Sequence, residues 1–428
     1  MLDKILLVSS WILAKSYLLF KSKWLYINKM NLVYILKYAR KNSSYYKEII
    51  PKCRITQSNV YNILEELPLL SKDIIREKDI FNKRINEGWS KWANTGGSTG
   101  EPLRFPLISS LIPYELICQM LIFMKMGYKI GDRIISIDGS RLSETNINKK
   151  HFYKFTDHSF PYGRHHFSVL YLEEDTFKYY ITSINQIKPH FLRGYPSAIK
   201  KFCELLKNSS YCLEFELKGC YLTSENFSNE DKEFIFDVLK CPIFGQYGHT
   251  EASVFAIQNH KSEEYICSLL YGYTEVLNES NQHVQVGEQG EIYVTGFTHL
   301  GLPFIRYKTG DLAIYGGKTI WGETILSRLI GRDSDYIYNL NKEKVYLVGF
   351  IFGGHLHAFD YMKEWQIVQN KIGYINLYIV RDKLYNDNIE NEIVELFRKN
   401  LFEVSVYYVE NIEKTVRGKR KFLIRNID

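Results

Sequence analysis

The sequence from residue 94 to residue 102 reads Asn-Thr-Gly-Gly-Ser-Thr-Gly-Glu-Pro, and this segment is the strongest clue to the fold. Glycine permits positive φ angles and lets the backbone approach a ligand closely. Consecutive amides in such a turn form a concave anion-binding nest, and the hydroxyl groups add donors. It is not a Walker loop, because no Gly-Lys-Ser/Thr follows at the required spacing. Taken alone, it suits a polyphosphate or, equally, an ordinary glycine- and serine-rich turn.

Composition indicates a globular, multidomain chain. It has 428 residues, of which 45% are hydrophobic and 24% charged, so we expect two or three domains. The net charge of +7 is modest and no basic block typical of nucleic-acid tails occurs, so no nucleic-acid partner is predicted. Seven cysteines without a Cys-x-x-Cys pair indicate a reducing cytoplasm rather than a disulfide framework or a zinc site.

The first residues combine apolar side chains with lysines. The apolar run from Ile5 to Leu13 is too short for a transmembrane helix, and no signal-peptide cleavage site stands out. The simplest interpretation of residues 4–24 is a helix packed on the protein body. The alternative is an interfacial helix at the inner face of the membrane, with Trp11, Leu18, Leu19, Phe20 and Trp24 in the lipid and lysines at the headgroups.

Apolar periodicity predicts two domains. Residues 1–72 are expected to be mainly helical, with one helix over 58–66 that has Ser58 as its N-cap. Strand and helix signals then alternate to about residue 300, which predicts an α/β layered core. We place the end of this large N-terminal domain at residue 333. Residues 334–428 are expected to form a small α+β domain, with strands over 374–380 and 404–409 and a helix over 388–400.

Four later segments carry side chains suited to nucleotide chemistry. In the segment 247–251, Tyr-Gly-His-Thr-Glu, a tyrosine can stack on a base, a threonine can meet a phosphate and a glutamate can hold Mg²⁺. The aspartate of the segment 305–312 can take both ribose hydroxyls, and an arginine of the segment 328–335 can reach ribose or phosphate. A lysine of the basic segment 414–421 can neutralise charge on a transferring phosphoryl group. Taken singly, each segment is explained as well or better as an ordinary turn, hairpin or basic tail.

The order and spacing of these segments resemble the adenylate-forming superfamily of acyl-CoA synthetases and peptide-synthetase adenylation domains. The match is closest to the phenylacetate–CoA ligase branch and its CapK-like relatives in capsule biosynthesis. Gly-Tyr-Pro-Ser at 194–197, Thr-Ser-Glu-Asn at 223–226 and Pro-Phe-Ile-Arg-Tyr-Lys-Thr-Gly-Asp-Leu at 303–312 look like that branch in particular. The resemblance runs from about residue 90 to residue 421 and implies a large α/β domain followed by a small domain that carries the catalytic lysine.

The resemblance also implies a reaction and its residues. A carboxylate attacks the α-phosphate of ATP to give an acyl-adenylate and pyrophosphate, and a second nucleophile then takes the acyl group. The implied catalytic residues are Thr99, Glu251 and Lys419, with Glu251 as the Mg²⁺ ligand. The implied nucleotide-binding residues are Thr95, Gly96, Gly97, Ser98 and Gly100 at the phosphates, Ser224, Glu225, Tyr247 and Gly248 at the adenine, Thr250 at a phosphate, and Asp311 and Arg332 at the ribose.

In relatives the acyl pocket lies between the phosphate loop and the Tyr-Gly-x-Thr-Glu motif. The candidates here are Tyr162, Arg164, His165, His166, His190, Arg193, Tyr195 and Gln246. So many polar side chains would suit a hydroxylated or anionic acid, such as a sugar acid, better than an aryl acid. Positions in surface loops are an equal alternative.

The sequence departs from its relatives at three places. Ser334 stands where relatives carry an acidic hinge residue, and residues 339–342 lack the glycine of the CoA-tunnel loop. CoA is therefore only one of three candidate acceptors of the acyl group, and an amine and a sugar are the others. No cysteine occurs in residues 313–327, so we predict no zinc there.

The sequence therefore predicts a cytoplasmic, Mg²⁺-dependent, adenylate-forming ligase that uses ATP on a carboxylic acid. Acyl transfer to an amine, a sugar or a thiol in capsular or O-antigen polysaccharide synthesis is the preferred role. An aryl-acid–CoA ligase is the enzymatic alternative. The alternative that is not an enzyme is a non-catalytic scaffold of a membrane-associated assembly. A scaffold would have no need to retain all four of Thr99, Glu251, Asp311 and Lys419.

Overall fold

The structure is a computed structural model that divides into two compact units. It describes residues 2–78, 80–81, 91–94, 103–107, 113–140, 142–157, 160–225, 227, 229–332, 336–346, 362–381, 385–412 and 423–427. Most of residues 1–328 form the first unit, and residues 329–428 form the second together with Gly310–Ala313. The predicted boundary at 333/334 stays a prediction, because residues 333–335 lie outside the described residues.

Helices make up most of the first 77 residues. They are α1 (Leu2–Leu19), a 3₁₀ turn η1 (Lys21–Lys23), α2 (Trp24–Asn42), α3 (Ser44–Ile49), α4 (Val60–Glu66) and α5 (Lys72–Glu77). The predicted Ser58 cap is wrong, because α4 begins at Val60 with Asn59 as the preceding residue. The Asn59 side chain instead accepts from the Thr56 amide at 2.8 Å and so closes the turn before the helix.

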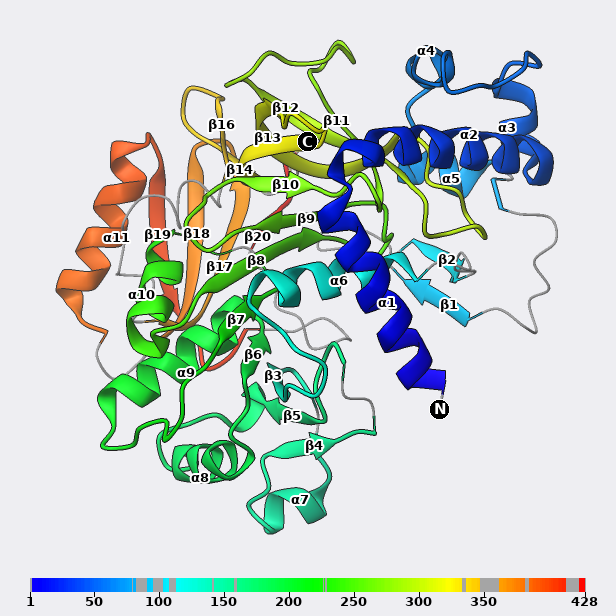
Figure 1. The fold of residues 1–428 in the computed structure, drawn as a ribbon. Helices are drawn as coiled ribbons and strands as arrows, with labels where there is room; N and C mark the ends of the chain where they lie inside the picture. Colours follow the sequence, from blue (N-terminus) through cyan, green and yellow to red (C-terminus); the bar gives the residue numbers. More distant parts are fainter. Residues whose placement is uncertain are drawn as a thin grey trace. The chain divides into compact units, whose positions relative to one another are not determined.

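A twelve-stranded mixed sheet forms the framework (Figure 1). Its spatial order is β11 (Gly272–Leu277), β12 (Gln289–Gly296), β13 (Tyr307–Lys318), β14 (Thr324–Arg332), β10 (Tyr265–Cys267), β9 (Phe255–Gln258), β8 (Ile243–Gly248), β7 (Gly219–Leu222), β6 (Phe191–Gly194), β3 (Ile134–Asp138), β5 (His165–Ser168) and β4 (Tyr153–Phe155). The neighbours β5, β3, β6, β7 and β8 are parallel. Parallel strands are buried on both faces, which explains their apolar runs. The predicted α/β layered fold is confirmed.

Helices cover both faces of the parallel strands. The first set is α8 (Phe177–Ile187), α9 (Pro196–Asn208) and α10 (Asn229–Leu239), whose apolar side chains pack on residues such as Leu192 and Ile243. On the other face lies α6 (Tyr114–Lys125), whose Phe123 ring contacts those of Phe191 and Tyr221 at 5.4 and 5.6 Å. Figure 1 shows α1 beside α6, and α7 (Glu144–Asn148) is a short surface helix.

A small hairpin precedes this framework. Strands β1 (Lys91–Asn94) and β2 (Arg104–Leu107) pair antiparallel, with Asn94 opposite Arg104. The predicted phosphate loop connects these two strands, and its residues 95–102 lie outside the described residues.

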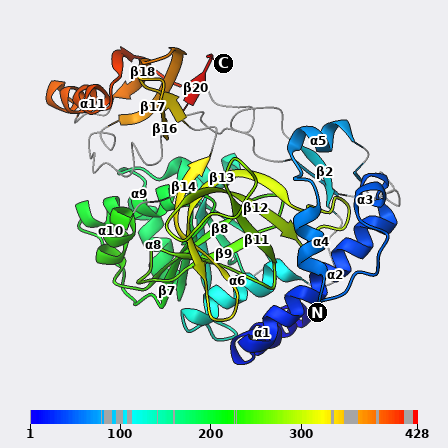
Figure 2. The same cartoon turned by 90° about the horizontal axis from the view of Figure 1, so that it is seen from above.

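The second unit has its own core. Its four-stranded sheet has the order β19 (Glu403–Tyr408), β18 (Tyr374–Arg381), β17 (Met362–Lys371) and β20 (Leu423–Arg425), and β15 (Tyr336–Tyr338) pairs with β16 (Lys344–Tyr346). Helix α11 (Asp387–Lys399) lies beside this sheet in Figure 2 and packs Ile393 and Phe397 against Ile367 and Leu377. This unit is therefore α+β.

A buried arginine ties the N-terminal helices to the large sheet. Arg306 is 5% exposed and donates to both carboxylate oxygens of Glu275, at 2.9 and 3.2 Å. It also donates to the backbone oxygens of Glu65 and Leu67, at 2.7 and 2.9 Å. Burial raises the pKa of Glu275, and the arginine opposes that shift. The ion pair is therefore satisfied by hydrogen bonds, as a buried charge requires.

Replacing this arginine tests its structural role. Arg306→Met should lower the free energy of unfolding by about 3–5 kcal/mol, because the Glu275 carboxylate is left buried without its partner. Urea unfolding followed by tryptophan fluorescence measures the loss, and Arg306→Met combined with Glu275→Leu should recover part of it. The control is Lys240→Ala, which removes an exposed pair with Asp237 and should cost about 0.5 kcal/mol or less. An Arg306→Met loss as small as that of the control would contradict the role.

Candidate active site

The best-defined polar site lies just after strand β8 and is centred on Glu251. This carboxylate is 6% exposed. Tyr307, the first residue of β13, donates its hydroxyl to Glu251 Oε1 at 2.7 Å, and His249 Nδ1 lies 3.3 Å from Oε2. Burial by itself would raise the pKa of Glu251, but His249 and the Tyr307 hydroxyl more than offset it and hold the pKa at about 2. Glu251 is therefore ionised at neutral pH.

An ionised carboxylate is the ligand type that Mg²⁺ prefers, so Glu251 fits the implied metal. The described residues contain no group of three His, Cys, Asp or Glu side chains arranged to hold a metal ion. A magnesium ion at Glu251 would therefore take its remaining ligands from nucleotide phosphate oxygens and water, as Mg²⁺ in nucleotide-binding enzymes commonly does.

Two histidines with unpartnered nitrogens accompany Glu251. Among the described residues, Nε2 of His249 and both ring nitrogens of His299 make no hydrogen bond, whereas Nδ1 of His249 faces Glu251. His299 is 6% exposed, and its ring lies edge-on to that of Phe105 at 5.5 Å. Burial, with the nearby His249, lowers the pKa of His299 to about 4, so this side chain is neutral at pH 7. Buried polar atoms without partners are rare and indicate a position where a ligand or water completes the bonding.

The predicted adenine-binding residues follow strands β7 and β8. Ser224 and Glu225 follow β7 after Thr223, and Glu225 Oε2 accepts from the Ser197 amide of α9 at 3.1 Å. Tyr247 and Gly248 end β8, and a Cβ on Gly248 would lie 3.1 Å from the Val254 oxygen. These residues share the carboxyl edge of the parallel strands, where open α/β sheets bind ligands.

Several predicted nucleotide residues lie outside this description. Residues 95–100 and Lys419 fall outside the described residues, and only the backbone of Arg332 is described. Asp311 is half-buried on β13, and Thr250 is exposed after β8. The roles of all these residues therefore remain predictions.

The strand register assembles part of the predicted acyl pocket. Aligned positions on β5, β3, β6, β7 and β8 form one row on the face that α6 covers, and they are His166, Ser136, Arg193, Tyr221 and Phe244. Arg193 lies at the middle of this row, with its guanidinium carbon 4.4 Å from the Tyr162 ring and 5.3 Å from the Tyr221 ring. Gln246 Oε1 accepts hydrogen bonds from Tyr221 and Thr223. Tyr162, His166, Arg193 and Gln246 therefore belong to one polar group.

Other predicted pocket residues lie apart from this group. His165 is the strand neighbour of His166, so it faces the opposite side of the sheet, where it packs on Tyr153 and Phe155 at 5.1 and 5.2 Å. His190 lies before β6, and its Nδ1 accepts from the Arg133 amide at 3.1 Å. Arg164 is exposed, and Tyr195 is the N-cap residue of α9 directly after β6.

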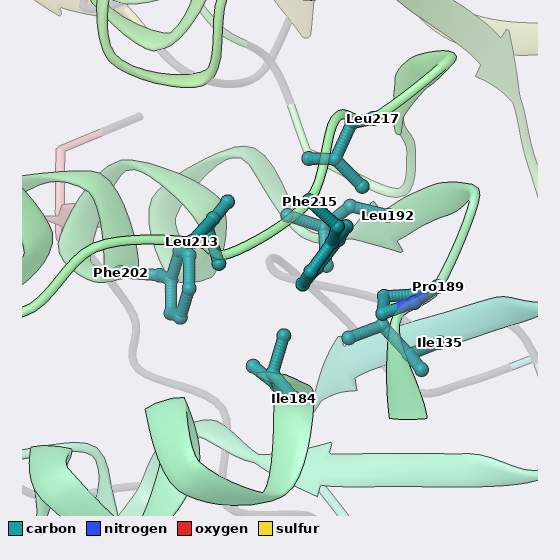
Figure 3. Close-up of a pocket in the computed structure, with 8 residues that line it drawn as sticks. All are labelled: Ile135, Ile184, Pro189, Leu192, Phe202, Leu213, Phe215 and Leu217. Atoms are coloured by element: carbon teal, nitrogen blue, oxygen red, sulfur yellow. The ribbon is translucent and has the colours of Figure 1, made fainter. Parts of the chain in front are cut away.

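A small cavity lies on the opposite face of the parallel strands (Figure 3). Its volume is about 10 Å³, and its eight lining residues are all apolar: Ile135, Ile184, Pro189, Leu192, Phe202, Leu213, Phe215 and Leu217. A dry space of that size holds at most one water molecule and offers it no hydrogen-bond partner. It is therefore a packing void rather than a substrate site.

Comparison with known proteins assigns the family. Residues 158–300 match the AMP-binding enzyme family, and residues 340–426 match the CapK C-terminal domain. Protein CapK of Staphylococcus aureus is 27% identical over 409 residues, which cover 91% of this chain and 86% of that protein. The chain is a CapK-like adenylate-forming enzyme. The predicted superfamily and enzyme class are confirmed.

Solved structures of adenylate-forming ligases share the fold of this CapK-like enzyme. A 2-hydroxyisobutyryl-CoA ligase in the postadenylation state has a TM-score of 0.65 at 16% identity, over 93% of this chain and 88% of that one. The O-succinylbenzoate–CoA synthetase MenE of Bacillus subtilis, in complex with ATP and magnesium, has a TM-score of 0.51 at 17% identity, over 77% and 68%. At these identities the likeness confirms the predicted adenylate-forming fold.

The low pKa of His299 gives a prediction on stability. The folded pKa of about 4 lies below the ordinary value of about 6.5, so the unfolded chain binds the extra proton first and stability falls as the pH drops from 6.5 to 4. We expect His299 to contribute about 3 kcal/mol to that fall. His299→Phe should remove this part of the pH dependence in melting temperatures measured between pH 4 and 7.5. The exposed His151→Gln is the control, and a His299→Phe curve parallel to that of the wild type would contradict the assignment.

Proposed function

We propose that this enzyme activates a carboxylic acid with ATP as an acyl-adenylate, with release of pyrophosphate. We further propose that it passes the acyl group to an amine, a sugar or a thiol in the synthesis of a surface polysaccharide. The observation that carries the proposal is the Glu251 site. A buried, ionised carboxylate is held there by Tyr307 and His249, at the carboxyl edge of the sheet in a chain of the AMP-binding enzyme family.

The residues have complementary roles in this proposal. Attack of a carboxylate on the α-phosphate builds negative charge there, and oriented cations and donors lower the barrier by stabilising it. Magnesium, held by Glu251, would supply positive charge at the phosphates. Thr99 and the other donors of residues 95–100 would bind the phosphates with Thr250, and Lys419 would neutralise the charge that develops. Tyr247, Ser224, Glu225 and Gly248 would line the adenine, with Asp311 and Arg332 at the ribose.

The acyl acceptor distinguishes two versions of the enzyme. Release of AMP that depends on an amine or a sugar, without CoA, would support the polysaccharide role. Release that depends on CoA, with an aryl acid as substrate, would support an aryl-acid–CoA ligase. A chain that binds no ATP would be a scaffold, which the buried charge of Glu251 argues against.

We also propose that the enzyme works in the cytoplasm, with its N-terminal helices on the inner face of the membrane. No helix among the described residues is long and apolar enough to cross a bilayer. Large apolar side chains are nevertheless exposed on and beside α1 and α2, and they include Val8, Ile12, Leu13, Leu19, Phe20, Leu25, Tyr26, Met30 and Tyr34. An exposed apolar patch of this kind marks a binding surface.

The charge of this segment suits anionic lipids. Residues 1–41 contain eight lysines and arginines but one acidic residue, so they carry a charge equal to the +7 of the whole chain. The inner face of α1 is already engaged, because Ala14 and Tyr17 are buried and the Tyr17 hydroxyl donates to Glu323 at 2.8 Å. The outer apolar face is therefore available to a membrane, with lysines at the headgroups.

Lys419→Ala tests the chemistry. We expect it to abolish acid-dependent exchange of pyrophosphate into ATP while ATP binding, measured by calorimetry, is retained, because the lysine stabilises the transition state rather than the bound nucleotide. The panel of acids should include aryl acids, amino acids and uronic acids. Lys421→Ala, in the same basic segment, is the control and should keep most of the activity. Unchanged exchange in the Lys419→Ala enzyme would disprove this role.

The membrane contact can be tested without disturbing the fold. Deleting residues 1–24 would remove buried Tyr17 and Trp24, whereas Ile12→Gln, Leu19→Gln and Phe20→Gln change side chains that are 55%, 66% and 53% exposed. We expect this triple variant to bind phosphatidylglycerol vesicles about tenfold more weakly or worse in a sedimentation assay, because less apolar area enters the lipid. The control exchanges Phe155, Leu170 and Val286, which are 53%, 55% and 69% exposed, for glutamine. Equal binding by both variants would exclude the contact.

A further inference from the structure

Arg193 is a buried cation for which the described structure provides no anion. Its residue is 8% exposed, and its Nε donates no hydrogen bond. No carboxylate among the described residues lies within ion-pair distance of its guanidinium, and every strand residue around it on β6 is buried. Burying a charged group without a partner costs several kcal/mol, so such a group needs an explanation.

Glu115 and Asp138, which act electrostatically on the same tyrosines as Arg193, are engaged by other groups. Glu115 of α6 accepts from the Gln119 amide at 2.8 Å and from the Tyr271 hydroxyl at 2.5 Å. Asp138 lies 2.9 Å from His166 Nδ1 and also accepts from Ser140. Both carboxylates therefore have partners of their own, and neither neutralises Arg193.

The surroundings hold the guanidinium in place instead of neutralising it. It lies over the rings of Tyr162 and Tyr221, which is the stacking geometry of a cation–π contact. Tyr221 is itself fixed, because its hydroxyl donates to Gln246 Oε1, which also accepts from Thr223 at 2.9 Å. The oxygen of Gln246 is thus occupied, and its Nε2 lies beside Gly248, 3.2 Å from the position that a Cβ there would take. No hydrogen bond from this Nε2 to another described residue is present. Arg193 and Gln246 thus supply unused donors on one face of the sheet.

We propose that the acid activated by this enzyme carries a second anionic group, and that Arg193 binds that group. The inference rests on the proposed function, since it assigns this polar group to the acyl substrate. The planar guanidinium presents parallel N–H donors that match a carboxylate, and the Gln246 amide adds a further donor. Tyr162 and Tyr221 would flank the part of the substrate that links its two acidic groups. The substrate class is therefore a dicarboxylic acid or a carboxylic acid with another acidic substituent, because an uncharged alkyl or aryl acid would leave the guanidinium unpaired.

Stability of the ligand-free protein separates a binding role from a structural one. If Arg193 awaits an anion, Arg193→Met should leave the melting temperature unchanged or raise it, because a buried unpaired charge is removed. The same substitution at Arg306, which has its carboxylate and backbone partners, should lower it. A fall for Arg193→Met comparable with that for Arg306→Met would make the guanidinium structural and overturn the inference.

Substrate preference provides the second test. The probes are malonate, succinate, glutarate and phthalate, each compared with its monomethyl ester, in the pyrophosphate exchange assay and in melting experiments. We expect the wild type to favour at least one diacid over its ester by about 30-fold or more in kcat/KM, because losing one partner of a buried charge pair costs that much. Arg193→Met should reduce the diacid-to-ester ratio of kcat/KM to about 1, and Arg193→Lys should keep part of the preference.

The possible outcomes separate this inference from the proposed function. Exchange with esters or monocarboxylic acids at least as fast as with every diacid would leave acid activation standing and overturn the role of Arg193. Absence of exchange with any acid would count against acid activation, and the inference would then be decided by melting. A rise in melting temperature caused by a diacid in the wild type but not in Arg193→Met would support it, and no difference between the two proteins would overturn it.

Discussion

Two consecutive residues, Arg306 and Tyr307, connect the stability of the fold to the geometry of the site. Arg306 binds Glu275 and the backbone oxygens of Glu65 and Leu67, so it fixes the N-terminal helices on the sheet. The next residue donates its hydroxyl to Glu251. Since the two side chains come from adjacent backbone positions, any shift of one moves the other. The carboxylate that would hold the metal is therefore positioned by the same segment that anchors the first 70 residues.

The two buried arginines show how folding and function place different demands on one residue type. Arg306 has a carboxylate and two backbone oxygens as partners, and its desolvation is offset within the protein. Arg193 stacks on two tyrosines and has no such carboxylate among the described residues. Buried polar groups that lack a hydrogen-bond partner within the protein occur mainly at functional sites, where a ligand provides the missing bond. The same reasoning applies to Nε2 of His249 and to both ring nitrogens of His299, which make no hydrogen bond among the described residues.

The sequence predicts some of these features well and others poorly, for physical reasons. The parallel strands were predictable, because strands buried on both faces must be apolar, as in Ile134–Asp138. The ordered motifs indicated the family through residues such as Glu251. His299 carried no signal, because its burial depends on Phe105, which lies almost 200 positions earlier in the chain. The row that contains Ser136, Arg193 and Tyr221 likewise depends on pairing between distant strands, which local periodicity does not specify. Only that register distinguishes His166 from its neighbour His165.

The positive charges of this chain lie in two different settings, which suit two different tasks. Those of residues 1–41 suit attraction to an anionic surface, and the buried Arg193 suits selection of a substrate. The positive charge of residues 1–41 equals that of the entire chain, so the remaining residues are neutral in sum. A fixed excess at one surface orients the protein toward an anionic partner over a distance of about a Debye length, 8–10 Å, but does not distinguish one acid from another. Arg193 differs, because a buried charge strongly penalises a bound ligand that leaves it unpaired and so discriminates between acids. Under these two proposals, location and specificity would change independently, the first through exposed side chains of the N-terminal helices and the second through one position in strand β6.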